Sequence, residues 1–131
     1  MAYRIYLVDD DRFLLDLYAV KFKNAGHDIH SFSGGEELLA ALRKEDAVMP
    51  DAILIDVIMP GMTGFETVAT IRKENLAKEA KIIFLSNQGQ NSDIEEAKKL
   101  TVDGYIIKAA AIPSEVLAET ERIIKGEAGH P

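Results

Sequence analysis

The sequence contains no cysteine. Disulfides, thiolate metal sites and cysteine nucleophiles are therefore excluded. Histidine is scarce and scattered, at His27, His30 and His130, so a histidine-based metal site is not expected. No apolar run approaches membrane-spanning length, and the N-terminus from Met1 to Ile5 lacks the apolar core of a signal peptide. These absences predict a cytoplasmic protein.

Basic residues are outnumbered by acidic ones. The net charge is -7, with 15 Lys and Arg against 22 Asp and Glu. This balance disfavours nucleic-acid binding, which needs a basic patch, and it is compatible with a site rich in carboxylates. The length of 131 residues and the apolar content of 47% fit one globular domain with a single core. We expect that domain at residues 1–126 and a short flexible tail at residues 127–131.

The most informative stretch surrounds Asp56. Residues 52–55 form an apolar run without polar alternation, which is typical of a fully buried strand. Pro60–Gly61 indicates a turn, and Thr63 with Glu66 forms a capping box that opens a helix. One carboxylate thus lies at the carboxyl end of a buried strand, where ligands bind in open α/β sheets. Taken alone, Asp56 fits a polar strand terminus equally well.

The rest of the chain alternates in the same way. We predict strands at residues 3–8, 27–32, 52–55, 81–85 and 103–107, with helices starting near residues 11, 33, 63, 92 and 113. Five strands alternating with five helices predict a parallel sheet covered on both faces. Right-handed crossovers favour the flavodoxin-like strand order 2-1-3-4-5. The expected fold is therefore an α/β three-layer sandwich of the (βα)5 type.

Local patterns add detail to the helices. Ser33–Glu36 and Ser92–Glu95 are predicted capping boxes for the second and fourth helices. In the first helix, Phe13, Leu17 and Val20 form one apolar stripe. The fourth helix is notably polar, so we expect its packing to be the weakest of the five.

The predicted strand order brings several polar residues to one edge of the sheet. Asp9 and Asp10 end the first strand, and Asp56 ends the third strand beside it, roughly 4.8 Å away. Carboxylates this close repel one another unless a cation joins them, and an all-oxygen cluster suits Mg²⁺. Ser86 and Lys108 end the fourth and fifth strands and supply a hydroxyl and an ammonium. A carboxylate nucleophile, a divalent cation and two donors form a site for phosphoryl transfer to aspartate.

At this point the sequence resembles the receiver domain of two-component response regulators, the CheY-like family, over about residues 3–125. The motifs that carry the resemblance are Leu7-Val-Asp-Asp10, Leu54-Ile-Asp-Val-Ile-Met-Pro-Gly61 with Gly64, Leu85-Ser86 and Asp103-Gly-Tyr-Ile-Ile-Lys108. Together these motifs are highly specific for the family.

The resemblance implies a phosphoprotein that acts in phosphorelay signal transduction. Asp56 would accept a phosphoryl group from a histidine kinase or a histidine phosphotransfer protein. Asp10, Asp56 and the backbone carbonyl of Ile58 would bind Mg²⁺ directly, and Asp9 would bind it through water. The protein would form and hydrolyse its own acyl phosphate and would not turn over an external substrate.

The resemblance also implies how the signal leaves the site. Ser86 would hydrogen-bond the phosphoryl group and Lys108 would pair with it. Tyr105 would turn inward as Ser86 moves, switching a face made of the fourth helix, fifth strand and fifth helix. Ile58 and Gln88 resemble positions that tune the lifetime of the phosphoryl group. The signal would reach an unknown downstream protein, without direct contact with nucleic acid or membrane.

Three positions depart from the family pattern. Asn87 replaces a small residue after the serine and is expected to narrow access to the acceptor. Ala109 follows Lys108 where the family usually has proline joined by a cis bond, and a cis bond without proline costs about 3–4 kcal/mol. Thr101 stands where a helix-ending glycine is expected, which should weaken that cap.

We interpret the chain as a stand-alone receiver, and three alternatives remain open. The first is a Mg²⁺-dependent phosphatase, although no substrate cap is evident and no second acid closely follows Asp56. The second is a receiver-like interaction module that is never phosphorylated, which Asn87 and Ala109 would favour. The third is the receiver fragment of a larger DNA-binding regulator.

Overall fold

The computed structural model describes residues 2–87, 91–108 and 111–126. Within these ranges, strands and helices alternate as β1 (Arg4–Val8), α1 (Arg12–Asn24), β2 (Asp28–Phe32), α2 (Gly35–Arg43), β3 (Ala52–Ile55), α3 (Gly64–Lys73), β4 (Lys81–Ser86), α4 (Asn91–Lys99), β5 (Gly104–Ile107) and α5 (Pro113–Ile124). The predicted tail at residues 127–131 lies outside the described residues. No helix in the described part is long and apolar enough to cross a membrane.

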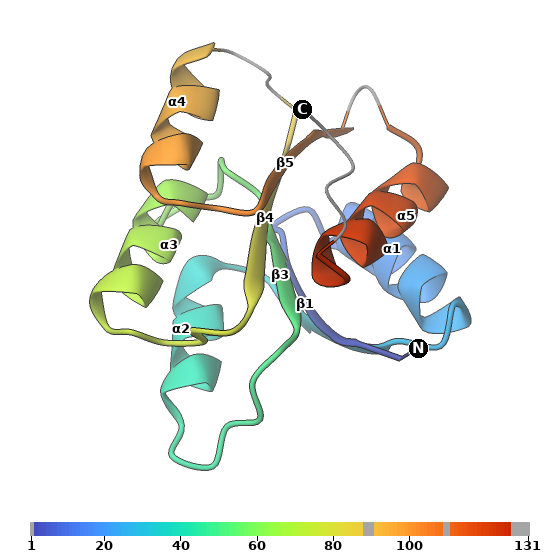
Figure 1. Ribbon diagram of the computed structural model, residues 1–131, viewed down its shortest axis with the longest axis horizontal. Helices are drawn as coiled ribbons and strands as arrows, with labels where there is room; N and C mark the ends of the chain where they lie inside the picture. The colour runs from blue at the N-terminus through green and yellow to red at the C-terminus, as the bar shows by residue number, and fades with distance from the viewer. Residues whose placement is uncertain (1, 88–90, 109–110, 127–131) are drawn as a thin grey trace.

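The five strands form one parallel sheet in the order β2-β1-β3-β4-β5. Helices α1 and α5 cover one face, and α2, α3 and α4 cover the other (Figure 1). The predicted flavodoxin-like three-layer sandwich is thereby confirmed. Because all the strands run the same way, their carboxyl ends meet at one edge of the sheet.

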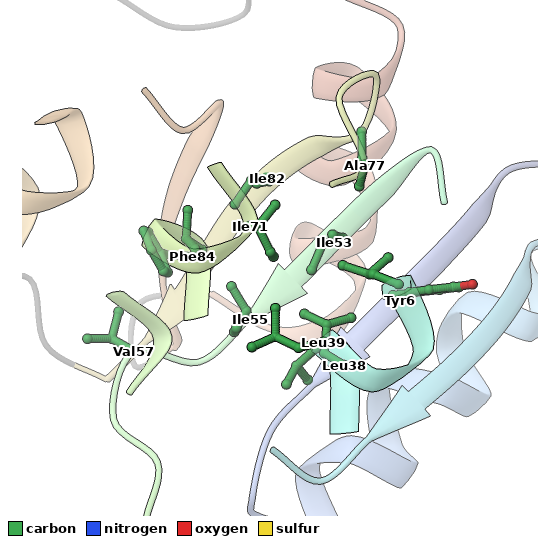
Figure 2. Close-up of a cluster of buried hydrophobic side chains, with 14 of the residues drawn as sticks. Tyr6, Leu38, Leu39, Ile53, Ile55, Val57, Ile71, Ala77, Ile82 and Phe84 are labelled. Atoms are coloured by element: carbon green, nitrogen blue, oxygen red, sulfur yellow. The ribbon is translucent and has the colours of Figure 1, made fainter. Parts of the chain in front are cut away.

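The central strand β3 is buried on both faces, as its uninterrupted apolar sequence predicts. Ile53 and Ile55 pack in the cluster with α2, α3 and α4, which Figure 2 shows. Ala52 and Leu54 pack in the cluster with α1 and α5. All four side chains are at most 1% exposed, so the strand that leads to Asp56 is fixed from both sides.

The apolar stripe predicted on α1 faces solvent. Phe13, Leu17 and Val20 are 76%, 42% and 57% exposed. The core is packed instead by a second stripe on the opposite side of the helix, made of Leu15, Tyr18, Ala19 and Phe22. Apolar residues occur on both sides of this helix, so helical periodicity alone does not decide which side is buried.

The helix N-termini agree with the sequence patterns only in part. In α3 the capping box is present: the Glu66 N–H donates to the Thr63 hydroxyl at 3.1 Å, and the Thr63 N–H donates to the Glu66 carboxylate at 2.9 Å. The box predicted at Ser33–Glu36 is wrong, because α2 is capped by the extended Gly34 without a side-chain bond. The box predicted at Ser92–Glu95 is also wrong, since α4 already begins at Asn91 and places Ser92 inside the helix.

Helix α4 is held loosely by its own side chains. Ala97 is its only buried side chain among those that the structure describes, and Ile94 is half-buried. Exposed charged residues occupy most of the remaining positions. By contrast, α2 buries Leu38, Leu39 and Leu42, as the sequence predicts.

Candidate functional site

The carboxyl edge of the sheet brings three carboxylates together. Asp9 follows β1 and Asp56 follows β3, and the Asp56 N–H donates to the Val8 carbonyl oxygen at 3.0 Å. One oxygen from each of Asp9, Asp10 and Asp56 lies within 4.8 Å of the other two. Asp9 and Asp56 are 4% and 9% exposed, whereas Asp10 is exposed to solvent. The adjacency of β1 and β3 therefore produces the predicted acidic cluster.

Lys108 joins this cluster from the end of β5. Its ammonium lies 2.7 Å from Asp9 Oδ2 and 3.3 Å from Asp56 Oδ2, and its side chain is 6% exposed. Burial alone would lower the pKa of Lys108, but the hydrogen bonds and charges of the two carboxylates outweigh it, so the pKa is raised. Lys108 is therefore a fixed positive charge between two of the acids.

Asp56 has the most perturbed carboxyl group of the site. Burial raises its pKa to about 6; Lys108 opposes this shift, the Asp9 charge reinforces it, and a hydrogen bond to the Ile58 backbone opposes it. At neutral pH the group is still mainly ionised. The structure thus presents a poorly solvated carboxylate, held by a lysine, at the edge of a buried strand.

Gly64 fixes the backbone behind the Asp56 carboxylate. A Cβ at this position would lie 2.2 Å from the Asp56 carbonyl oxygen, and the Gly64 N–H donates to the Val57 carbonyl oxygen at 2.8 Å. Only glycine lets the start of α3 approach the loop this closely. The sequence places Gly64 in a motif, but the close contact with Asp56 becomes apparent only in three dimensions.

A pocket of about 280 Å³ opens over these groups. Its lining residues are Asp9, Asp10, Asp11, Leu14, Asp56, Ile58, Ser86, Asn87 and Lys108. Among the described residues, the structure therefore brings the predicted site residues of four strand ends together, except Tyr105. Leu14 was not predicted as a lining residue. The only sequence signal for it is its position one turn after Asp11, the N-cap of α1.

Ser86 and Tyr105 connect the pocket to the outer part of the sheet. Ser86 is 1% exposed, and Tyr105 on β5 is half-buried. Burial raises the pKa of Tyr105, a side-chain hydrogen bond with Ser86 opposes that shift, and the charges of Asp93 and Asp56 add to it. Tyr105 thus lies behind Ser86 and outside the pocket lining. The predictions for Gln88 and for the Lys108–Ala109 bond concern positions outside the described residues.

The donor set suits a hard divalent cation. Three carboxylates within 4.8 Å of one another offer only oxygen ligands, which Mg²⁺ prefers over nitrogen or sulfur. Asp10 is exposed, so the cluster opens to the solvent from which an ion would enter. The acidic group of Asp9, Asp10 and Asp56 could therefore bind a metal ion.

Known proteins are similar to this chain in sequence and in fold. Residues 5–119 match the response regulator receiver domain family. The alkaline phosphatase synthesis transcriptional regulatory protein PhoP of Bacillus subtilis is 30% identical over 125 residues, which cover 95% of this chain and 50% of that protein. The chemotaxis protein CheY4 of Vibrio cholerae is similar with a TM-score of 0.83 at 27% identity, covering 94% of this chain and 99% of that one. A CheY-like receiver from Methanospirillum hungatei shares the fold, with a TM-score of 0.85 at 22% identity and 97% of each chain covered.

The fold and the acidic edge define a receiver of two-component signalling. This chain belongs to the response regulator receiver domain family. It spans about half the length of the curated relative that it matches. Membership implies interaction with a histidine kinase or a phosphotransfer partner, and receivers in general do not turn over an external substrate.

Proposed function

We propose that this receiver accepts a phosphoryl group on Asp56 in a Mg²⁺-dependent reaction. The observation that carries the proposal is the Lys108 ammonium held 2.7 Å from Asp9 and 3.3 Å from Asp56, inside a cluster of three carboxylates. A structural ion pair would need one acid for one lysine. Here three carboxylates surround one lysine ammonium. Such an excess of negative charge is what a site for a metal ion and a phosphoryl group requires.

In the proposed reaction an Asp56 carboxylate oxygen attacks the phosphorus of a phosphohistidine. The new P–O bond forms as the P–N bond breaks, and the electron pair leaves with the imidazole nitrogen, which then takes a proton. Lys108 and the Ser86 hydroxyl lie at the pocket wall, where they could donate to phosphoryl oxygens. Mg²⁺ held by Asp9, Asp10 and Asp56, with the Ile58 carbonyl, would supply positive charge to those oxygens. Attack by water on the phosphorus would later restore the carboxylate.

Exposed apolar residues at the carboxyl edge of the sheet favour a protein as the phosphoryl donor. Phe13 on α1, Ile58 after β3 and Ile112 before α5 are 76%, 57% and 61% exposed. All three belong to segments at the carboxyl edge of the sheet. A small donor would need only the charged pocket, whereas an apolar rim around it suits a protein surface that carries a phosphohistidine.

We further propose that Ser86 and Tyr105 pass the modification to the face formed by α4, β5 and α5. Their hydrogen bond joins the pocket wall to β5. The sparse burial of α4 supports this role, because elements that move are drawn from the least stable parts of a fold. An unknown downstream protein would bind the altered face.

Two further expectations remain predictions. The receiver domain is expected to occupy residues 1–126. Ile58, Asn87 and Gln88 are expected to tune access to Asp56 and the lifetime of its phosphoryl group. Asn87 is exposed and lines the pocket, which stays open beside it, so it does not favour the module that is never phosphorylated.

Intact-mass analysis after incubation with acetyl phosphate and Mg²⁺ tests the proposed function. We expect one added phosphoryl group in the wild type, none in Asp56→Asn, and none with EDTA. Asp46→Asn, at an exposed loop position, is the matched control and should be labelled like the wild type. Failure of the wild type to be labelled and to bind beryllofluoride would overturn the proposal, as would labelling that persists in Asp56→Asn.

A further inference from the structure

The C-terminal end of α4 closes without the glycine that such an end normally requires. Thr101 has φ of 55°, in the left-handed region that a β-branched residue rarely adopts. The Leu100 N–H donates to the Ala97 carbonyl oxygen at 3.1 Å, and the Thr101 N–H donates to the Lys98 carbonyl oxygen at 3.0 Å. The end is therefore tightly wound around a strained residue, and another part of the fold must hold it there.

Arg72 of α3 makes the contacts that hold this end. Its Nε donates to the Leu100 carbonyl oxygen at 3.3 Å, and its Nη2 donates to the Thr101 carbonyl oxygen at 3.0 Å. Both carbonyls lie just beyond Lys99, the last residue of α4, where the helix dipole is negative. The Leu100 carbonyl oxygen also accepts from the Thr101 hydroxyl at 2.6 Å, and the guanidinium adds a charged donor to it. The side chain of one helix thus caps the end of its neighbour.

The segment that follows is fixed from the sheet. The Asp103 N–H donates to the Ile82 carbonyl oxygen at 2.8 Å, and the Asp103 carboxylate accepts from the Ile82 N–H at 2.8 Å. In the first turns of α4, Asp93 and Ile94 are partly exposed, and Glu95 and Glu96 are exposed. The anchoring contacts that the structure describes thus lie at and just after the C-terminal end of α4.

Arg72 can also release its contacts without leaving a buried charge. It borders an open polar pocket of about 330 Å³, which it shares with Lys78, Lys81, Thr101 and Asp103 among other residues. Water can therefore solvate the guanidinium if the carbonyls move away. The anchor is strong enough to favour one position of the helix end and accessible enough to be broken.

We propose that Arg72 is a positioning residue that fixes the C-terminal end of α4 and makes the helix pivot about Thr101, with its movable end beside Ser86. Because the helix is fixed at its C-terminal end, a small shift of Ser86 would displace the first turns of α4. The pivot rests on the proposed switching of the α4-β5-α5 face, but the anchor itself is a property of the unphosphorylated protein and can be tested there.

Amide hydrogen exchange of the unphosphorylated protein tests the anchor. In Arg72→Met, which keeps the aliphatic stem, the amides of residues 98–101 should exchange about tenfold faster or more, while those of β3 stay unchanged. Thr101→Gly relieves the left-handed strain and should therefore slow the exchange of these amides. In the double variant with Arg72→Met, it should return their exchange rates toward those of the wild type. Arg43→Met is the matched control, because Arg43 pairs with Glu74 on the same face of the sheet and, among the described residues, forms no hydrogen bond or ion pair with α4.

Beryllofluoride titration followed by NMR tests the pivot. In the wild type we expect the shifts of α4 to be large over residues 91–96 and small over 99–102, and in Arg72→Met to extend to the end of the helix. The proposed anchor would be overturned if the amides of residues 98–101 exchanged at equal rates in Arg72→Met and Arg43→Met. Faster exchange spread evenly over the domain would overturn it as well. Wild-type shifts largest at 99–102 would overturn the pivot. Lack of beryllofluoride binding would count against the proposed function and leave the exchange result standing.

Discussion

Helices α3 and α4 lie on the same face of the sheet, and each follows a strand that ends in a site residue, yet they are held in opposite ways. Helix α3 starts with a complete capping box and buries Thr67, Val68 and Ile71. Helix α4 buries only Ala97 among its described side chains and depends on Arg72 of α3 for its C-terminal cap. The helix behind the acceptor is thus built into the core, and the helix behind Ser86 is attached at one end.

This difference separates two tasks within one domain. The loop after β3 is fixed by Gly64 and the buried face of α3, as the proposed nucleophile Asp56 would require, because such a group must be held within a fraction of an ångström of its working position. An element that reports a chemical change must have a second position of similar free energy. The weak packing of α4 supplies that freedom.

The largest effect is expected from Gly64→Ala. The new Cβ would collide with the Asp56 carbonyl oxygen at 2.2 Å, and because this is backbone it cannot rotate away. We expect a loss of about 4 kcal/mol or more in the free energy of unfolding, together with slower labelling of Asp56. Urea unfolding measures the loss. Gly34→Ala is the control, since its Cβ would meet nothing within 4 Å. Equal losses of unfolding free energy in the two variants would contradict the view that the Asp56 loop is held rigidly by Gly64.

The same substitution in the two helices compares their anchoring directly. Ile71 on α3 is 0% exposed, and Ile94 on α4 is half-buried. Ile71→Ala should cost about 3 kcal/mol of unfolding free energy, and Ile94→Ala about 1 kcal/mol or less. Denaturant midpoints at constant slope give both values. A loss in Ile94→Ala as large as that in Ile71→Ala would show that α4 is packed as firmly as α3.

Ionisation of Asp56, in the rigid part of the site, should also lower the free energy of unfolding in a way that depends on pH. The folded pKa of Asp56 is raised to about 6 from the ordinary 3.8, so folding favours its protonated form. Its stabilising contribution is complete below about pH 4 and is lost as the pH rises through 6. In EDTA, Asp56→Asn should therefore be more stable than the wild type by about 2 kcal/mol at pH 7.5 and nearly equal to it at pH 4. A stability difference that does not change with pH would contradict this account.

The strand order and the acidic edge could be predicted from the sequence because they follow from simple patterns. The uninterrupted apolar run of residues 52–55 marks a buried strand, and acids at the ends of adjacent parallel strands must converge. The partners that hold the site were harder to foresee. The contact of Gly64 with the Asp56 carbonyl joins a helix start to a strand end and depends on tertiary packing.

The wrong predictions concern segments whose local sequence pattern fits two different structures. Helix α1 carries apolar residues on opposite sides, and the sheet buries the side with Tyr18 and Phe22 instead of the side with Phe13 and Leu17. At α2, Gly34 takes the N-cap position and the Ser33 hydroxyl donates to the Glu37 carboxylate, so the pattern at Ser33–Glu36 does not act as a cap. Thr101 was recognised as an unusual helix end, but its compensation by Arg72 crosses between helices and leaves no trace in the local sequence.

The apolar rim of Phe13, Ile58 and Ile112 gives the site a kinetic selectivity. A protein with a net charge of -7 repels small phosphorylated metabolites over distances of about a Debye length, roughly 10 Å at 0.1 M salt. A folded donor that buries apolar surface against the rim gains free energy that a free dianion cannot gain. Under the proposed function, long-range repulsion and short-range desolvation together would make a phosphorylated protein a faster donor than a small phosphorylated metabolite.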